Sequence, residues 1–386
     1  MLPMSKNIIT GIDIGTHSVK VIIAQSQAHG APLILGTAVK HTHGLKNGYI
    51  TNAHEVRRSL QVAVSKAEQM ANLQIDSAFV GIGGVGLDSL YVKSDVTLLK
   101  SEATVEDQDI DRVINQSLKK AQKSLVNRKV IHKIPIKFYI DGKEILGEPT
   151  GMKGNKLSAD IMLITALEPH FNSLREIVES LDIDVLDMVA SPIAASLVVL
   201  SNEQKEAGCV LANIGAETVS IIVYEDGTPI SLKVFPTGSS DITSEIALRL
   251  QVPLKQAEEM KRGSLYDQAI PKKKLDDIIS ARLKEMFMLI KAHLKDIGKD
   301  GLLPAGVILT GGGVGIAKIK DLARVALKLP SELAQLKVHN KTLKDSTWAV
   351  AYGLCIYGNG KVSYSRSHTA LKLKHLLSKF FKYFAP

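Results

Sequence analysis

The segment at residues 8–23, IITGIDIGTHSVKVII, decides the fold of this chain. Two runs of β-branched residues flank the turn GTHS at 15–18, and this pattern predicts a β-hairpin. The same order of strand, glycine turn and strand returns at residues 210–224, VLANIGAETVSIIVY. A repeat of this kind predicts two lobes of related topology, each presenting a glycine turn between strands.

The rest of the sequence predicts α/β lobes with one insert. A strand follows the hairpin at 33–40, and Asn52 can cap the helix after it. At 84–162 strands surround a helix that starts near Thr104, which predicts a small α+β insert in the first lobe. We expect the first lobe at 7–83 and 163–203, the insert at 84–162, the second lobe at 204–240 and 300–357 with a helical part at 241–299, a polar linker at 358–370 and a closing helix at 371–386.

The first glycine turn carries the ingredients of a phosphate site. Gly15 permits close backbone approach, and successive N–H groups in a tight turn form an anion nest. Lys20 returns on the next strand as a charge for terminal phosphate oxygens, and Asp13 is placed to hold Mg²⁺ through water. A plain hairpin with a polar tip is the alternative. The nucleotide residues predicted here are Asp13, Gly15, Thr16, His17, Ser18 and Lys20, with Asp13 also the metal residue.

The second turn departs from this pattern, because Asn213 stands where a carboxylate would best hold metal or orient water. Asn213 and Thr218 can still donate to phosphate, and Gly215 lets the backbone approach. The negative charge of Glu217 is unfavourable beside phosphates, so we expect its carboxylate either to face away or to bind the metal. These residues favour ATP binding over hydrolysis.

A third glycine turn, Gly311-Gly312-Gly313, ends an apolar strand and opens a helix. Bare backbone there can accept a flat ligand such as adenine near a helix N-terminus, although a merely flexible turn is the alternative. Glu258 and Lys261 lie at i and i+3 on a predicted helix, where the pair can grip ribose hydroxyls and a base edge. An ordinary surface ion pair is the competing interpretation.

The charge distribution points to an anionic partner other than nucleic acid. The net charge is +9, and from residue 361 onward the chain contains lysines and arginines but no Asp or Glu. Aromatic residues make up 5% of the chain, and no RNP, zinc-finger or KH signature is present, so nucleic acid is not an expected partner. The two isolated cysteines predict neither a disulfide framework nor a zinc site.

The C-terminal segment is the clearest non-enzymatic signal. On a helical wheel its leucines and phenylalanines share one face opposite its lysines, as in a helix that lies in a membrane interface. Each lysine near anionic headgroups contributes about 1 kcal/mol. A helix packed on the protein's own core is the alternative. The predicted membrane residues are Leu373, Leu376, Leu377, Phe380, Phe381, Phe384, Lys372, Lys379 and Lys382.

Together these features resemble the actin, Hsp70 and sugar-kinase superfamily, and within it the chain is similar to the FtsA family of bacterial cell-division proteins. The similarity extends over nearly the whole chain and is carried by GIDIGTHSVKV, GLKNGYITNAHEV, TVEDQDIDRVINQSLKKAQ, VIHKIPIKFYID, VLDMVASPIAAS, AEEMKRGS and VILTGGG. The insert and the tail are its specific parts. The resemblance implies an α/β, actin-like, two-lobed fold with subdomains 1A, 2A and 2B, in which the insert is the SHS2-type subdomain 1C.

The resemblance also implies a function. Family members bind ATP, polymerise in actin-like fashion, tether FtsZ filaments to the cytoplasmic face of the inner membrane at the septum, and recruit other divisome proteins. Subdomain 2B would receive the acidic C-terminal peptide of FtsZ, although a solvated basic face is an equally ordinary interpretation. The basic residues concerned are Lys272, Lys273, Lys274, Arg282 and Lys284.

One departure from the family and two alternatives qualify this resemblance. The second turn usually reads D-I-G-G-G-T in the family and reads NIGAET here, so we expect slow or absent hydrolysis. A PilM-like protein of type IV pilus assembly would share the fold and the DIGxxSVK turn but lack a basic membrane helix. A phosphotransferase or ATPase of the sugar-kinase type is disfavoured by Asn213 and by the lack of a recognisable sugar site.

Overall fold

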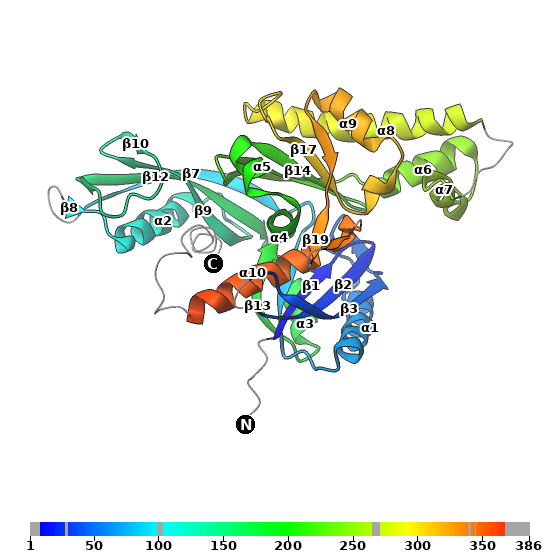
Figure 1. The fold of residues 1–386 in the computed structure, drawn as a ribbon, viewed down its shortest axis with the longest axis horizontal. Coiled ribbons are helices and arrows are strands. Elements are labelled where there is room, and N and C mark those ends of the chain that lie inside the picture. Colours follow the sequence, from blue (N-terminus) through cyan, green and yellow to red (C-terminus); the bar gives the residue numbers. More distant parts are fainter. Residues whose placement is uncertain are drawn as a thin grey trace.

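The computed structural model describes residues 8–27, 30–98, 103–264, 271–338, 341–343 and 345–366. Two lobes and an insert make up the molecule. In Figure 1, lobe I lies at the bottom around β1 (Ile8–Ile14) and lobe II lies at the upper right around β14 (Cys209–Ile214). The insert extends to the left with α2 (Asp107–Ala121) and β12 (Lys156–Leu167).

Lobe I is built on a five-stranded sheet with the order β13-β6-β1-β2-β3. The predicted hairpin forms β1 and β2, β3 pairs antiparallel with β2, and β6 and β13 run parallel to β1 on the other side. The predicted cap of α1 is present, because the Asn52 side chain accepts a hydrogen bond from the Glu55 N–H. The bounds are β1 Ile8–Ile14, β2 Ser18–Gln25, β3 Leu33–His41, β4 Leu45–Lys46, β5 Tyr49–Ile50, α1 Ala53–Ala71, β6 Ser77–Ile82, α3 Glu168–Glu179 and β13 Asp184–Ala190.

Lobe II repeats this arrangement. Its sheet order, β18-β17-β14-β15-β16, has the same succession of two parallel and two antiparallel pairs, so the repeat seen in the sequence is also a repeat in structure. Side chains of α6, α8 and α9 form a core with one face of this sheet. The bounds are α5 Asn202–Ala207, β14 Cys209–Ile214, β15 Val219–Glu225, β16 Thr228–Phe235, α6 Ser239–Leu250, α7 Leu254–Lys261, α8 Lys272–Asp296, β17 Gly306–Thr310, α9 Ile319–Leu327, β18 Ser331–Leu333, β19 Leu336–Val338 and β20 Lys341–Leu343.

Two helices join the lobes. Helix α4 (Ser191–Val199) directly follows a strand of lobe I and also packs against strands of lobe II. Helix α10 (Ala349–Arg366) follows lobe II in the sequence and packs on the sheet of lobe I. The helices cross closely, since a Cβ at Gly353 would lie 1.8 Å from the Ala194 carbonyl oxygen. The largest core cluster contains residues of both helices and both sheets, so the lobes share one core along this crossing.

The insert has a core of its own between α2 and an antiparallel sheet with the order β10-β9-β12-β7. Helix α2 begins at Asp107 rather than near Thr104, because the Glu106 N–H donates to the Asp109 carboxylate and ends the preceding extended segment. Thr104 instead lies in a short strand. The bounds are β7 Asp88–Thr97, β8 Ala103–Thr104, α2 Asp107–Ala121, β9 Arg128–Ile140, β10 Lys143–Ile145, β11 Lys153–Gly154 and β12 Lys156–Leu167.

The edge of the insert contacts the edge of lobe II. The Ser89 hydroxyl on β7 donates to the Leu232 carbonyl oxygen on β16 at 2.9 Å and accepts from the Leu232 N–H at 3.2 Å. Beside it, the Lys233 ammonium and the Asp88 carboxylate pair at 2.9 Å. The insert is therefore attached to lobe I through the chain and through packing of β9 and β12, and it also contacts lobe II through Ser89 and Asp88.

The linker predicted from residue 358 is wrong over its first part, because α10 continues to Arg366. Gly358 lies tightly against Phe79, and Lys361 pairs with Asp187 on β13, so contacts with lobe I hold a turn-like sequence in a helix. Residues 367–370 of the predicted linker and the predicted membrane helix at 371–386 lie outside the described residues. In the part of the chain that is described, no helix has both the length and the apolar character needed to cross a bilayer.

Candidate functional site

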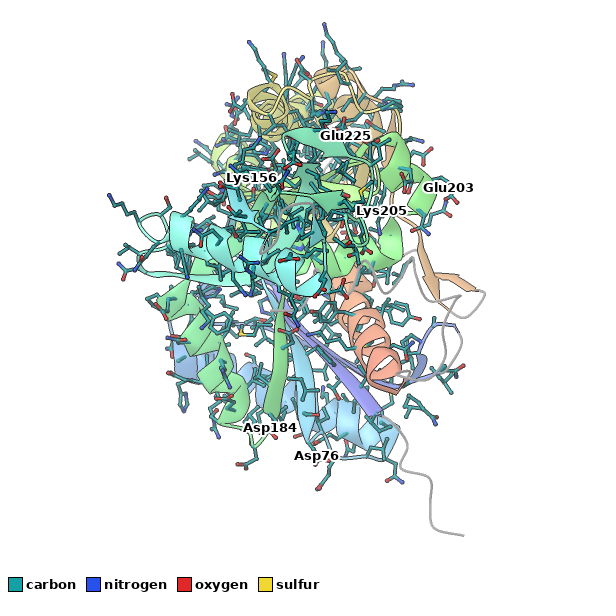
Figure 2. All side chains as sticks on the ribbon, turned by 90° about the vertical axis from the view of Figure 1, so that its left-hand side faces the viewer. Asp76, Lys156, Asp184, Glu203, Lys205 and Glu225 are labelled. Carbon is teal, nitrogen blue, oxygen red and sulfur yellow. The ribbon has the colours of Figure 1, made fainter. Side chains whose placement is uncertain are left out.

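The carboxyl ends of strands from both lobes meet at a cavity of about 810 Å³. Ligands bind at this edge in open α/β sheets, and the volume is in the usual range for small-molecule sites. Every residue predicted above to contact a nucleotide lines this cavity. The opposite ends of β6 and β13 lie near Asp76 and Asp184, at the bottom of the molecule in Figure 2.

The first turn is closed by a hydrogen bond from the Gly15 N–H to the Ser18 carbonyl oxygen at 3.1 Å. Asp13 and Lys20 lie directly opposite one another on β1 and β2, and the Lys20 ammonium donates to the Ser18 hydroxyl at 3.0 Å. Burial raises the pKa of Asp13, and the charge of Lys20 opposes this shift. The turn therefore combines bare backbone with one cation and one carboxyl group.

The second turn is closed in the same way, by the Gly215 N–H and the Thr218 carbonyl oxygen at 2.8 Å. Here Asn213 lies opposite Ser220, so the carboxyl–ammonium pair of the first turn is replaced by two neutral side chains. Of the two turns, the first therefore carries an ammonium group for phosphate, while the second offers neutral side chains.

Glu217 faces away from this cavity and is not one of its lining residues. Its carboxylate accepts a hydrogen bond of 2.6 Å from the backbone N–H of Asn47 in lobe I. Of the two orientations expected from the sequence, this contact supports the one directed away from the phosphates.

The third turn requires glycine at its first position. Gly311 has a φ of +94°, and a Cβ there would lie 2.2 Å from the side-chain oxygen of Asn213. A 3₁₀ turn at Gly312–Gly315 separates this glycine from α9, which begins later than the sequence suggested. At Gly312 the nearest atom to a built Cβ is 3.9 Å away, on Thr347, so the backbone there is open to a ligand.

The Glu258–Lys261 pair is a fixed part of the site. The Glu258 carboxylate lies 2.7 Å from the Lys261 ammonium and 2.7 Å from Arg262, and it accepts from the Thr243 hydroxyl at 2.6 Å. Burial opposes ionisation of Glu258, but these hydrogen bonds outweigh it and lower its pKa to about 2. Lys261 is 8% exposed and also donates to the Ser239 carbonyl oxygen, which argues against an ordinary surface pair.

The structure adds residues that the sequence did not single out. Arg262 and His41 also line the cavity, and the rings of His17 and His41 lie 4.7 Å apart. Burial, followed by the charge of His41, lowers the pKa of His17. The lobe I side also contributes Gly48, Gly83, Gly84, His170 and Ser191. In the sequence, the feature that could have identified two of them is that Gly83 and Ser191 directly follow buried strands.

A nucleoside triphosphate with Mg²⁺ fits these residues. The open glycine backbone, the hydroxyls and Lys20 suit phosphate oxygens, and Asp13 would hold the ion. Among the described residues no group of three metal-ligating side chains comes together. Mg²⁺ at phosphates takes one or two carboxylates plus water, so a single Asp is compatible with it.

The other predicted binding residues lie elsewhere. Lys272, Lys273, Lys274 and Lys284 are exposed on α8, and none of them lines the cavity. Arg282 already pairs with Glu245 at 2.8 Å and Glu285 at 2.7 Å. The predicted membrane residues Leu373, Leu376, Leu377, Phe380, Phe381, Phe384, Lys372, Lys379 and Lys382 lie outside the described residues.

Comparison with known families and proteins agrees with this architecture. Residues 210–353 match the model of the family described as cell division protein FtsA, and residues 86–165 match the SHS2 domain inserted in FTSA. The cell division protein FtsA of Pseudomonas aeruginosa is 28% identical over 383 residues, covering 93% of this chain and 91% of that protein. That of Bacillus subtilis is 26% identical and covers 84% and 78%, respectively.

Solved structures show the same fold. The PilM-PilN type IV pilus biogenesis complex contains a chain that matches with a TM-score of 0.68 and 16% identity, over 91% of this chain and 98% of that one. MreB5 of Spiroplasma citri bound to ADP matches with a TM-score of 0.55 and 11% identity, over 95% of this chain and 100% of that one. At these identities the similarity is one of fold.

Proposed function

Because the chain belongs to the FtsA family of cell division proteins, we propose that it is an ATP-binding, actin-like scaffold that tethers FtsZ filaments to the membrane. The observation that carries this proposal is the pair of matched turns, closed at Gly15 and Gly215, that face one cavity from two lobes. ATP with Mg²⁺ would lie there, with its phosphates between the turns and its adenosine toward Gly311–Gly313, Glu258 and Lys261.

ATP acts mainly as a structural ligand in this proposal. Among the described residues that line the cavity, the carboxylates are Asp13 and Glu258, and Glu258 is bound by three neighbours. Asn213 and Ser191 offer no carboxylate to orient an attacking water. A ligand that contacts both lobes stabilises the conformation in which the lobes are closed around it. A conformation selected in this way can control self-assembly.

The FtsZ partner would dock on the helical part of lobe II. Lys272, Lys273, Lys274 and Lys284 are exposed on α8 and can attract an acidic peptide, whereas Arg282 contributes less because it is already paired. The insert and lobe faces would make the contacts of a homopolymer and of other division proteins.

The tail would place this scaffold at the cytoplasmic face of the inner membrane, at the septum. Its leucines and phenylalanines, with lysines opposite, suit an interfacial helix. Since one such helix binds reversibly, polymerisation would supply the avidity for stable attachment.

Co-sedimentation with anionic liposomes tests this proposal. The full chain should sediment with lipid and retain an FtsZ C-terminal peptide in the presence of ATP. A chain ending at Thr369, and a full chain with Phe380→Ala and Phe381→Ala, should lose lipid binding but keep the peptide. The double variant keeps every lysine, so it separates apolar insertion from simple charge attraction. Unchanged lipid binding by both variants would contradict the tether.

A further inference from the structure

A tight hairpin in lobe I lies between the two lobes and the base of the insert. Strands β4 and β5 pair directly, and the two residues between them, Asn47 and Gly48, have φ values of +50° and +80°. An Asn-Gly pair with two positive φ angles is typical of a rigid type I′ turn. The tip of this hairpin therefore has a fixed backbone direction.

The tip contacts lobe II through one side chain. The Asn47 N–H donates to the Glu217 carboxylate at 2.6 Å, although the two residues are 170 positions apart. Both residues are half-buried, and a charge-assisted bond of this kind is stronger than a neutral one. Glu217 belongs to the second glycine turn, so this hydrogen bond links a turn that lines the cavity to lobe I.

The turn that carries Glu217 is itself held in place. The N–H groups of Ser239 and Ser240 donate to the carbonyl oxygens of Gly215 and Ala216 at 2.9 and 2.8 Å. A Cβ at Gly238 would lie 2.3 Å from the Ala216 carbonyl oxygen, which shows how closely the start of α6 approaches. A shift of this turn would therefore carry Glu217 with it.

The other side of the hairpin holds the segment that enters the insert. The Asn47 carbonyl oxygen accepts from the Val85 N–H at 3.3 Å, and a Cβ at Gly48 would lie 2.4 Å from the Gly84 Cα. Two residues later, the Gly86 carbonyl oxygen accepts from Arg128 at 2.8 Å. The chain then enters β7, whose edge contacts lobe II.

We propose that Glu217 is an interlobe clasp, which joins the second phosphate turn to the Asn47-Gly48 hairpin and through it to the base of the insert. The clasp holds the two lobes together before a ligand binds. Nucleotide binding therefore does not have to supply all of the free energy of closing the lobes. It also makes the position of the insert respond to the phosphate turn. This inference rests on the proposed nucleotide site for its role in regulation, but the contact itself does not depend on a ligand.

Amide hydrogen exchange and ATP titration on the full chain test the clasp. Glu217→Ala and Glu217→Leu remove the acceptor, and Glu217→Gln keeps an acceptor oxygen without the charge. Glu225→Ala, at the far end of the strand β15 that follows this turn, is the control. Without nucleotide, the first two variants should exchange faster at residues 45–50 and 84–87. They should also bind ATP about ten-fold more weakly, whereas Glu217→Gln should restore most of both properties.

Two results would overturn the clasp: unchanged exchange at 45–50 in both acceptor-free variants, or tighter ATP binding by them. The second result would mean that Glu217 acts by repelling phosphate. If the wild-type chain binds no ATP, the proposed nucleotide site fails, while the exchange comparison still decides whether the clasp exists.

Discussion

At the scale of residues, His170 is a buried histidine that lines the cavity. It is 7% exposed on the lobe I side of the cavity, and its ring lies 5.0 Å from that of Tyr49. Neither ring nitrogen makes a hydrogen bond of normal geometry with the described residues. Burial lowers the pKa of His170 to about 4, so the ring is neutral at pH 7.

This shift predicts a pH dependence of stability. The unfolded chain takes up a proton at His170 near its ordinary value, whereas the folded chain does so near 4, so stability falls as the pH drops through this window. Between pH 7 and pH 5 the loss from this residue is about 2 kcal/mol. Urea unfolding of His170→Phe should therefore show a smaller loss on acidification. His54→Phe, at an exposed position, should leave the pH dependence unchanged, and equal slopes in all three proteins would contradict the prediction.

The sequence predicted the cavity residues that follow strands with a clear pattern, such as Asp13 and Gly311, because local spacing is sufficient to place them. It did not determine the direction of Glu217, which depends on a backbone N–H 170 positions away. Arg262 was missed for a related reason, since its place in the cavity lining goes with its pairing to Glu258.

At the scale of elements, the crossing of α4 and α10 is the tightest helix contact described. Gly353→Ala would place a Cβ 1.8 Å from the Ala194 carbonyl oxygen, so the helices would have to separate. We expect this change to lower the free energy of unfolding by about 3 kcal/mol. Gly315→Ala, where a Cβ meets no atom within 4 Å, is the control and should be nearly neutral in the same denaturation experiment. Equal stability of the two variants would refute the close crossing.

The contact between β7 and β16 predicts a second element-scale effect. Ser89→Ala removes both hydrogen bonds to Leu232, which should weaken insert docking by about 1 kcal/mol and raise amide exchange along β16 about five-fold. Ser94→Ala removes a hydrogen bond within the insert, from Ser94 to Val113, and should leave β16 unchanged. Increased exchange on β16 in both variants would show that the insert is loosened generally rather than undocked.

Element boundaries were predictable where caps and periodicity agree, as at Asn52 before α1. The predicted boundaries were wrong where contacts beyond the local pattern determine the start or end of a helix. The start of α2 depends on the Glu106–Asp109 contact, and the last turns of α10 depend on packing against lobe I. Glycines and polar residues after 357 resemble a turn in sequence, but Lys361 finds its partner on β13.

At the scale of the whole molecule, the internal repeat explains why a cavity forms between the lobes. Two sheets of the same topology direct the carboxyl ends of their strands toward each other, and the crossing helices hold the sheets together. The two halves have diverged in charge, since the pair formed by Asp13 and Lys20 has a neutral counterpart in Asn213 and Ser220. Of the two turns, the first is therefore expected to make the charged contact with a phosphate ligand.

Calorimetric titration of ATP with Mg²⁺ into the full chain tests this account most directly. The wild-type chain should bind one ATP, and Lys20→Met should weaken binding by about ten-fold or more, because it removes the one cation set opposite Asp13 on the first turn. Lys46→Met, at an exposed position on β4, is the matched control and should bind like the wild type. Absence of ATP binding by the wild type, or equal affinity of Lys20→Met, would contradict the assignment of this cavity as a nucleotide site.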